Sequence, residues 1–153
     1  MYTNEKTAEV LNDLIRINND RIEGYNKAAN ELESKDVDLQ AIFRQMSAES
    51  RSYANDLSKY VASSGKKVET DTTVAGKVYR TWMDVKATFT GKDRKAILSS
   101  CEYGEDAAQK AYDTALSSDA ELSTEIRQLI MDQKTSLKRS HDTIKKMRDA
   151  QPA

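Results

Sequence analysis

The stretch LSSCEYGEDAAQKAYDTAL, residues 98–116, decides how this chain folds. Its inward positions recur at alternating steps of three and four, the pattern of a helix that packs in a bundle. Four of these positions hold Leu98, Cys101, Ala108 and Tyr112, but the one between Cys101 and Ala108 holds Glu105. The pattern therefore predicts a carboxylate that points toward the core. The partners of Glu105 decide between a metalloenzyme and a plain helical bundle.

The composition is that of one helical domain. The chain has 153 residues, 38% of them hydrophobic and 32% charged, with one Pro and five Gly. A chain of this length is one domain that can bury a core, and strands and turns would need more Gly and Pro. The formal net charge of -1 gives no overall attraction to nucleic acid or to an anionic membrane. We therefore expect an all-α protein with neither of these partners.

The localisation that we expect is cytoplasmic. Residues 1–14 lack the basic region and apolar run of a signal peptide. No apolar stretch approaches the roughly 20 residues that cross a bilayer. The single cysteine, Cys101, cannot form an internal disulfide, as is usual in a reducing compartment.

Apolar periodicity predicts four long helices and a short one. Their approximate ranges are 4–33, 37–63, 74–89, 93–117 and 123–149. Asp36 is the expected N-cap of the second helix, and Ser123 or Ser118 caps the last one. The short helix carries Trp82, and we expect it to cross one end of the bundle.

An internal repeat relates the two halves of the chain at an offset of 87 residues. The offset aligns core residues of both helix pairs and also their expected caps: it places Leu11 on Leu98, Tyr25 on Tyr112, Asp36 on Ser123, Leu39 on Ile126 and Leu57 on Ile144. Chance periodicity could match one helix but would seldom match two and the loop between them. The sequence therefore predicts two helical hairpins joined by a long crossover, which is a four-helix bundle.

Four segments of the chain carry a resemblance to a known family. They are VLNDLIRINNDRIEGYNKAANEL (10–32), AGKVYRTWMDVKATFTGKDRKAIL (75–98), CEYGEDAAQKAYDTAL (101–116) and KRSHDTIKKMRDA (138–150). Over nearly its whole length the chain resembles a bacterial family of uncharacterised ferritin-like bundle proteins, a domain of unknown function. The resemblance implies a ferritin-like four-helix bundle and a stress-linked role.

The ligand positions of di-iron members of the ferritin-like superfamily can be compared with the residues of this chain. These members place one Glu on each of two helices and a Glu-x-x-His on each of the other two. The repeat offset shows which residues occupy these places here, and only Glu105 matches; the others are Asn18, Ser50, Tyr53, Leu137 and Ser140. The sequence therefore predicts that the di-iron ligand set has been lost.

A weaker metal site stays open as an alternative. A shift of one residue recovers Glu49 and His141, although neither completes a Glu-x-x-His. Glu49, Glu105 and His141 are thus the candidate ligands of a metal such as iron, if the fold brings them together.

The interpretation that we prefer is a hydrogen-bonded polar layer inside the bundle. Buried polar groups need partners, and such a layer also fixes the register of helices. We expect the layer to consist of Asn18, Tyr53, Glu105, Gln133 and Ser140, with Glu105 accepting a hydrogen bond from Tyr53 or Asn18.

Other candidate residues favour a structural role. Cys101 on an apolar stripe is typical of an inert core thiol, and His141 is typical of a packed or half-exposed residue. Glu102, Asp20 and Glu23 are expected on outward faces as solvated charges.

Three functions remain at this stage. The first is a non-enzymatic cytoplasmic bundle that acts through protein contacts and self-associates, with a homodimer as the expected state. The second is a metal-binding or oxidase-type enzyme that uses Glu49, Glu105 and His141. The third is a bundle that binds a small apolar ligand in its interior.

Overall fold

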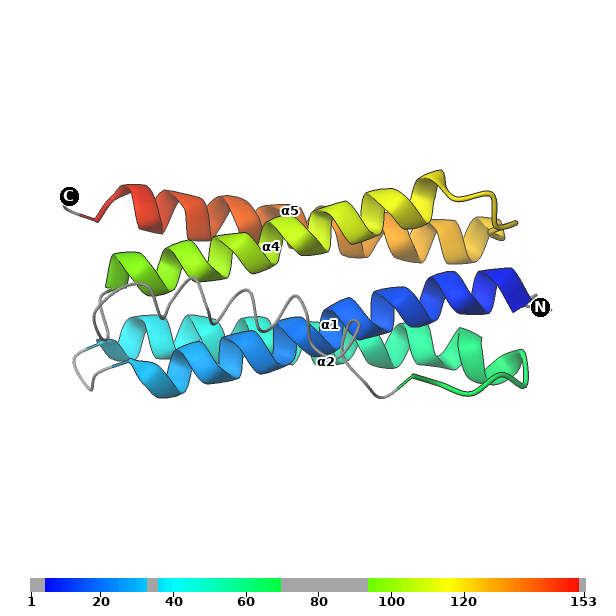
Figure 1. Cartoon of the computed structure of the whole chain (residues 1–153), viewed down its shortest axis with the longest axis horizontal. Helices are drawn as coiled ribbons and strands as arrows, with labels where there is room; N and C mark the ends of the chain where they lie inside the picture. Colours follow the sequence, from blue (N-terminus) through cyan, green and yellow to red (C-terminus); the bar gives the residue numbers. More distant parts are fainter. Residues whose placement is uncertain (1–4, 33–35, 70–93, 152–153) are drawn as a thin grey trace.

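The computed structural model describes residues 5–32, 36–69 and 94–151. Within these ranges the chain forms four long helices: α1 (Glu5–Glu31), α2 (Val37–Ser63), α4 (Arg94–Ser117) and α5 (Thr124–Asp149). They run side by side along the length of the molecule (Figure 1). This confirms the all-α prediction, and the helix bounds lie close to those expected. The predicted short helix at 74–89 lies outside the described residues.

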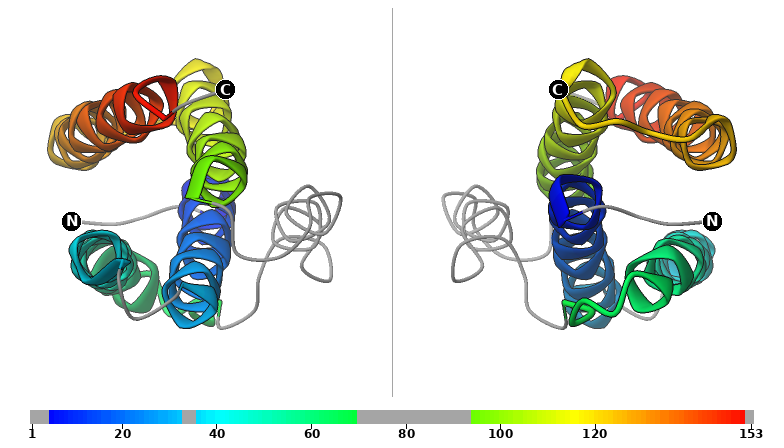
Figure 2. Two further views of the ribbon diagram at one scale, coloured as in Figure 1. Left: turned by 90° about the vertical axis from the view of Figure 1, so that its left-hand side faces the viewer. Right: turned by 90° about the vertical axis from the view of Figure 1, so that its right-hand side faces the viewer.

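The four helices form two hairpins, α1 with α2 and α4 with α5. The hairpins pack against each other through α1 and α4, whereas α2 and α5 make few contacts with each other. Seen end-on, α2 and α5 lie on the same side of the α1–α4 pair (Figure 2). The second helices of the two hairpins, α2 and α5, therefore face each other with little direct packing between them.

The offset of the sequence repeat is also present in the helix starts. Helix α2 begins at Val37 and α5 begins at Thr124, which are 87 residues apart. The Ser123 side chain caps α5 as predicted, because its oxygen accepts a hydrogen bond from the Ile126 backbone nitrogen at 3.1 Å. Asp36 is the N-cap residue of α2, as predicted, but its side chain makes no cap hydrogen bond. Its carboxylate instead accepts a charge-assisted hydrogen bond from Arg94 at 2.7 Å, which joins the starts of α2 and α4.

The cap of α5 gives a first testable prediction. Ser123→Ala should lower the free energy of unfolding by about 1 kcal/mol, because the Ile126 backbone nitrogen loses its acceptor. Urea unfolding followed by circular dichroism measures the change. Ser123→Asp keeps an acceptor and is the matched control, so a similar loss in both variants would contradict the role of the cap.

The apolar core consists of two parts. The first cluster contains Leu11, Leu14, Leu57, Tyr112, Ile130 and Leu137, and the second contains Tyr25, Leu39, Phe43, Leu98, Cys101 and Ile144, among others. Between them, every helix contributes buried polar side chains: Asn18, Arg21, Ser47, Ser50, Glu105 and Ser140. We call these six residues the polar belt. It crosses the bundle near its middle and separates the two apolar clusters.

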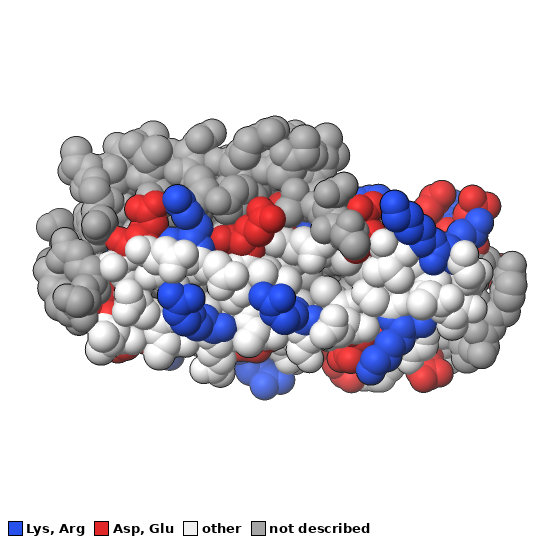
Figure 3. All heavy atoms as spheres, turned by 90° about the horizontal axis from the view of Figure 1, so that it is seen from below, with Lys and Arg blue, Asp and Glu red and all other residues white. Residues whose placement is uncertain are grey.

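The surface carries charges of both signs. On the face formed by α1 and α2, basic and acidic side chains occur among large uncharged areas (Figure 3). None of the described helices combines the length and the apolar character that a membrane span requires.

Candidate functional site

The centre of the polar belt is an ion pair between α1 and α4. Arg21 and Glu105 are each 1% exposed. The Arg21 Nε donates to Glu105 Oε1, and its Nη2 donates to Glu105 Oε2 at 3.4 Å. Its Nη1 donates to Ser50 Oγ at 2.7 Å and to the Met46 carbonyl at 2.9 Å, both on α2. One guanidinium thus joins three helices.

The Arg21 guanidinium keeps its positive charge inside the bundle. Burial alone would lower the pKa of Arg21, but the negative charge of Glu105 and the hydrogen bond to it outweigh burial and raise that pKa. The Arg21 Cζ also lies 5.1 Å from the centre of the Tyr25 ring, which is cation–π distance. A fixed positive charge is therefore built into the middle of the bundle.

A second chain of hydrogen bonds runs beside the ion pair and reaches all four helices. Asn18 Nδ2 donates to the Tyr112 hydroxyl at 2.9 Å, and that hydroxyl donates to Gln133 Oε1 at 2.6 Å. Gln133 Nε2 then donates to the Tyr53 carbonyl at 3.3 Å. Burial raises the pKa of Tyr112, so its hydroxyl keeps the proton that it donates.

The residues of the predicted polar layer take the following places. Asn18, Glu105, Gln133 and Ser140 are buried, and Tyr53 is half-buried. The expected donors to Glu105 are wrong: Tyr53 donates to Glu49 at 3.3 Å and Asn18 donates to Tyr112. The donor is Arg21, whose guanidinium carries the opposite charge and makes stronger hydrogen bonds than a hydroxyl or an amide.

Arg21 is the main residue that the sequence reasoning missed. It lies three residues after Asn18 and four before Tyr25, so it shares their inward face of α1. The neighbouring Ile22 is apolar and would be expected on the inward face, but it is only partly buried. The presence of an inward carboxylate, Glu105, on a facing helix was the signal that could have pointed to a basic partner.

One carboxylate is also placed differently from the expectation. Asp20 was expected in solvent, but it is fully buried. Helix α1 is covered on more than one side, so its buried face is wider than a single stripe. Glu23 is exposed as expected, and Glu102 is partly buried.

The belt residues do not fit a di-iron centre. Such a centre needs several carboxylates and imidazoles that converge on two cations. The guanidinium of Arg21 occupies both oxygens of the Glu105 carboxylate, and Glu105 also acts on the buried Tyr25, neither of which is a ligand of such a centre. The residues around Glu105 therefore do not fit a di-iron centre of the ferritin type.

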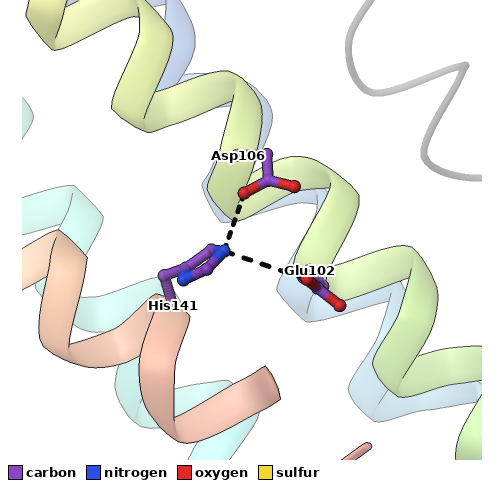
Figure 4. Close-up of side chains that lie close together, drawn as sticks. All are labelled: Glu102, Asp106 and His141. Atoms are coloured by element: carbon purple, nitrogen blue, oxygen red, sulfur yellow. Dashed lines mark ion pairs between the residues drawn. The ribbon is translucent and has the colours of Figure 1, made fainter.

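The alternative set of Glu49, Glu105 and His141 is not brought together either. Glu105 pairs with Arg21, while Glu49 accepts a hydrogen bond from Tyr53. His141 lies instead beside two acids of α4: its Nε2 is 2.7 Å from Asp106 Oδ1 and 3.9 Å from Glu102 Oε1 (Figure 4). Glu102 is predicted from the sequence to lie in solvent, and Asp106 is not among the candidates that the sequence indicates.

A groove lies between the second helices of the two hairpins. Its volume is about 310 Å³. Helix α2 lines it with Ile42, Gln45, Met46 and Glu49, and α5 lines it with Ser136, Arg139, Ser140 and Thr143. The groove follows from the fold, because α2 and α5 make few contacts with each other.

These features define a class of protein: a four-helix bundle of two repeated hairpins whose core is divided by a charged belt. A family model for a domain of unknown function, DUF2383, matches residues 6–118, which is most of the chain. The chain therefore belongs to the DUF2383 family. The matched region includes Arg21 and Glu105, and α5 with His141 follows it. A search of curated proteins found no significant match.

Proposed function

We propose that this protein is a non-enzymatic, ferritin-like bundle that acts in the cytoplasm through contacts with other protein chains. The observation that carries the proposal is the Arg21–Glu105 ion pair. In a ferritin-like relative, metal ions would supply the positive charge at the middle of the bundle. Here the guanidinium of Arg21 supplies it.

Electrostatics explains why this arrangement opposes metal binding at Glu105. A metal ion at the Glu105 carboxylate would lie within a few ångströms of the Arg21 guanidinium. Two unit positive charges 4 Å apart repel by roughly 4 kcal/mol at an effective dielectric constant of 20, and a divalent ion is repelled more. The ion would also have to displace hydrogen bonds that are already made.

Metal analysis of untagged protein tests the proposal. After addition of ferrous iron and air, we expect Glu105→Ala and the wild type to retain the same amount of iron and to give the same optical spectrum. Stoichiometric iron that the wild type retains and Glu105→Ala loses would overturn the proposal.

We also propose that the protein contact includes a second copy of the chain, which would form a homodimer at the α2–α5 groove. A two-fold interface must be self-complementary, so a residue of one copy meets a different residue of the other. The groove meets this requirement because one wall carries the acidic Glu49 and the other carries the basic Arg139. In a two-fold dimer, Glu49 of each copy can face Arg139 of the other.

Charge reversal gives a testable prediction for the dimer. Arg139→Glu should shift the protein toward the monomer, because it places like charges opposite each other. The double variant Glu49→Arg with Arg139→Glu should restore the dimer. Sedimentation at several concentrations measures the mass.

Arg127→Glu is the matched control, since Arg127 is an exposed residue of α5 that does not line the groove. The same mass in all variants would contradict the proposed interface.

A further inference from the structure

We infer that Glu102, Asp106 and His141 form a binding site for a divalent transition-metal ion, separate from the polar belt. Each residue offers one ligand atom, and these atoms lie within 4.8 Å of one another. The inference goes beyond the proposed function, which concerns Glu105 and the α2–α5 groove.

Two helices hold the three ligands in position. Glu102 and Asp106 are four residues apart on α4, so their side chains lie one turn apart on the same face. His141 projects toward both of them from α5 (Figure 4). The Glu102 and His141 side chains are 13% and 14% exposed, while Asp106 is 54% exposed. Two ligands are thus held by packing, and the third lies at an opening to solvent.

The distances suit one ion. The His141 Nε2 lies 2.7 Å from Asp106 Oδ1 and 3.9 Å from Glu102 Oε1. Two ligands of a tetrahedral ion with bonds of about 2.1 Å are about 3.4 Å apart, which lies between these two values. The Asp106 side chain is 54% exposed, so it has room to rotate and lengthen the shorter of these two distances.

Charged neighbours hold the proposed ligands in orientation, as residues hydrogen-bonded to the ligands do in known metal sites. The His141 Nδ1 lies 3.2 Å from Asp142 Oδ1, so Nδ1 can donate its proton there and direct the lone pair of Nε2 toward the two acids. The Arg148 Nη1 holds Glu102 Oε2, which leaves Oε1 facing the site. Both ring nitrogens of His141 therefore face carboxylates. A cation bound at Nε2 would lie between the ring and the carboxylates of Glu102 and Asp106. The Arg148 guanidinium repels a bound cation, as Arg21 does at Glu105, but its side chain is 27% exposed, so solvent screens the repulsion.

The donor set selects the kind of metal. One imidazole nitrogen and two carboxylate oxygens suit Zn²⁺, Co²⁺ or Mn²⁺, whereas Ca²⁺ and Mg²⁺ prefer sites made of oxygen alone. Three protein ligands leave a coordination position for water. Because the ligands come from α4 and α5, the bound ion would also clamp this hairpin and stabilise the folded state.

Titration of chelator-treated, untagged protein with Zn²⁺ tests the site. We expect one equivalent to bind in calorimetry and to raise the melting temperature. His141 is the single histidine of the chain, so nitrogen-15 NMR of its imidazole reports the ligand atom directly. The Nε2 resonance should shift on addition of Zn²⁺, and Nδ1 should remain protonated.

Variants separate this site from the rest of the molecule. Asp106→Asn should weaken Zn²⁺ binding by at least about tenfold, His141→Gln should abolish it, and Asp142→Asn should weaken it by about 10- to 100-fold. Glu49→Gln and Glu105→Ala are controls that should bind as the wild type does. Asp106 is half-exposed, so its variant remains informative if His141→Gln fails to fold.

Two outcomes would overturn the inference. The first is no saturable Zn²⁺ binding, or only adventitious binding that Asp106→Asn and His141→Gln leave unchanged. The second is binding that is lost in Glu105→Ala but kept in His141→Gln. That pattern would also overturn the proposed function, whereas loss in His141→Gln alone leaves the proposed function intact.

Discussion

Arg21→Met should lower the free energy of unfolding by about 3–5 kcal/mol, because it leaves the charged Glu105 buried without its partner. Arg21 also joins α1 to Ser50 and to the Met46 carbonyl on α2, so the variant removes the donor to those acceptors. Urea unfolding monitored by circular dichroism measures the loss.

A double variant is the matched control for the ion pair. Replacing both Arg21 and Glu105 by Met removes the two charges together, and such replacements of buried pairs are often neutral or stabilising. We expect the double variant to regain most of the stability that Arg21→Met loses. A double variant as unstable as the sum of the two single ones would contradict a direct interaction between these side chains.

Tyr112→Phe should lower the free energy of unfolding by about 1–3 kcal/mol. The hydroxyl of Tyr112 accepts from Asn18 and donates to Gln133, and its removal leaves Gln133 Oε1 without this donor in the core. The phenyl ring keeps the apolar contacts, so the change isolates the hydrogen bonds. Chemical unfolding at neutral pH measures the effect.

Tyr103→Phe is the control for that experiment. Tyr103 lies on the same helix but is 36% exposed, so loss of its hydroxyl should leave stability almost unchanged. Equal effects of the two variants would show that the chain from Asn18 through Tyr112 to Gln133 does not stabilise the bundle.

The fold could be predicted because it depends on repeated apolar spacing. The offset of 87 residues located both hairpins, and the positions of Leu11 and Leu98 or of Tyr25 and Tyr112 are core positions in the structure. The partner of the Asp36 carboxylate could not be predicted in the same way. Whether its carboxylate caps a helix or pairs with Arg94 depends on where α4 begins in space, which local sequence does not encode.

The site could be predicted only in part, for a physical reason. Periodicity showed that Glu105 points inward, because an apolar stripe surrounds it. The same method assigns an arginine to the solvent face, since burial of a charge is unfavourable unless it is paired. The burial of Arg21 depends on how α1 packs against α4. The contact of His141 with Glu102 and Asp106 depends in the same way on how α5 packs against α4. Spacing within one helix does not reveal them.

The polar belt has a consequence for a chain that contains two similar hairpins. Repeated helices with alike apolar faces could also associate with their own copies in a neighbouring molecule. Such an encounter of α1 with α1 would bring two guanidinium groups together in a medium of low dielectric constant, and α4 with α4 would bring two carboxylates together. Only the pairing of α1 with α4 unites opposite charges. The ion pair thus distinguishes the two halves of the repeat and disfavours the pairing of either helix with its own copy.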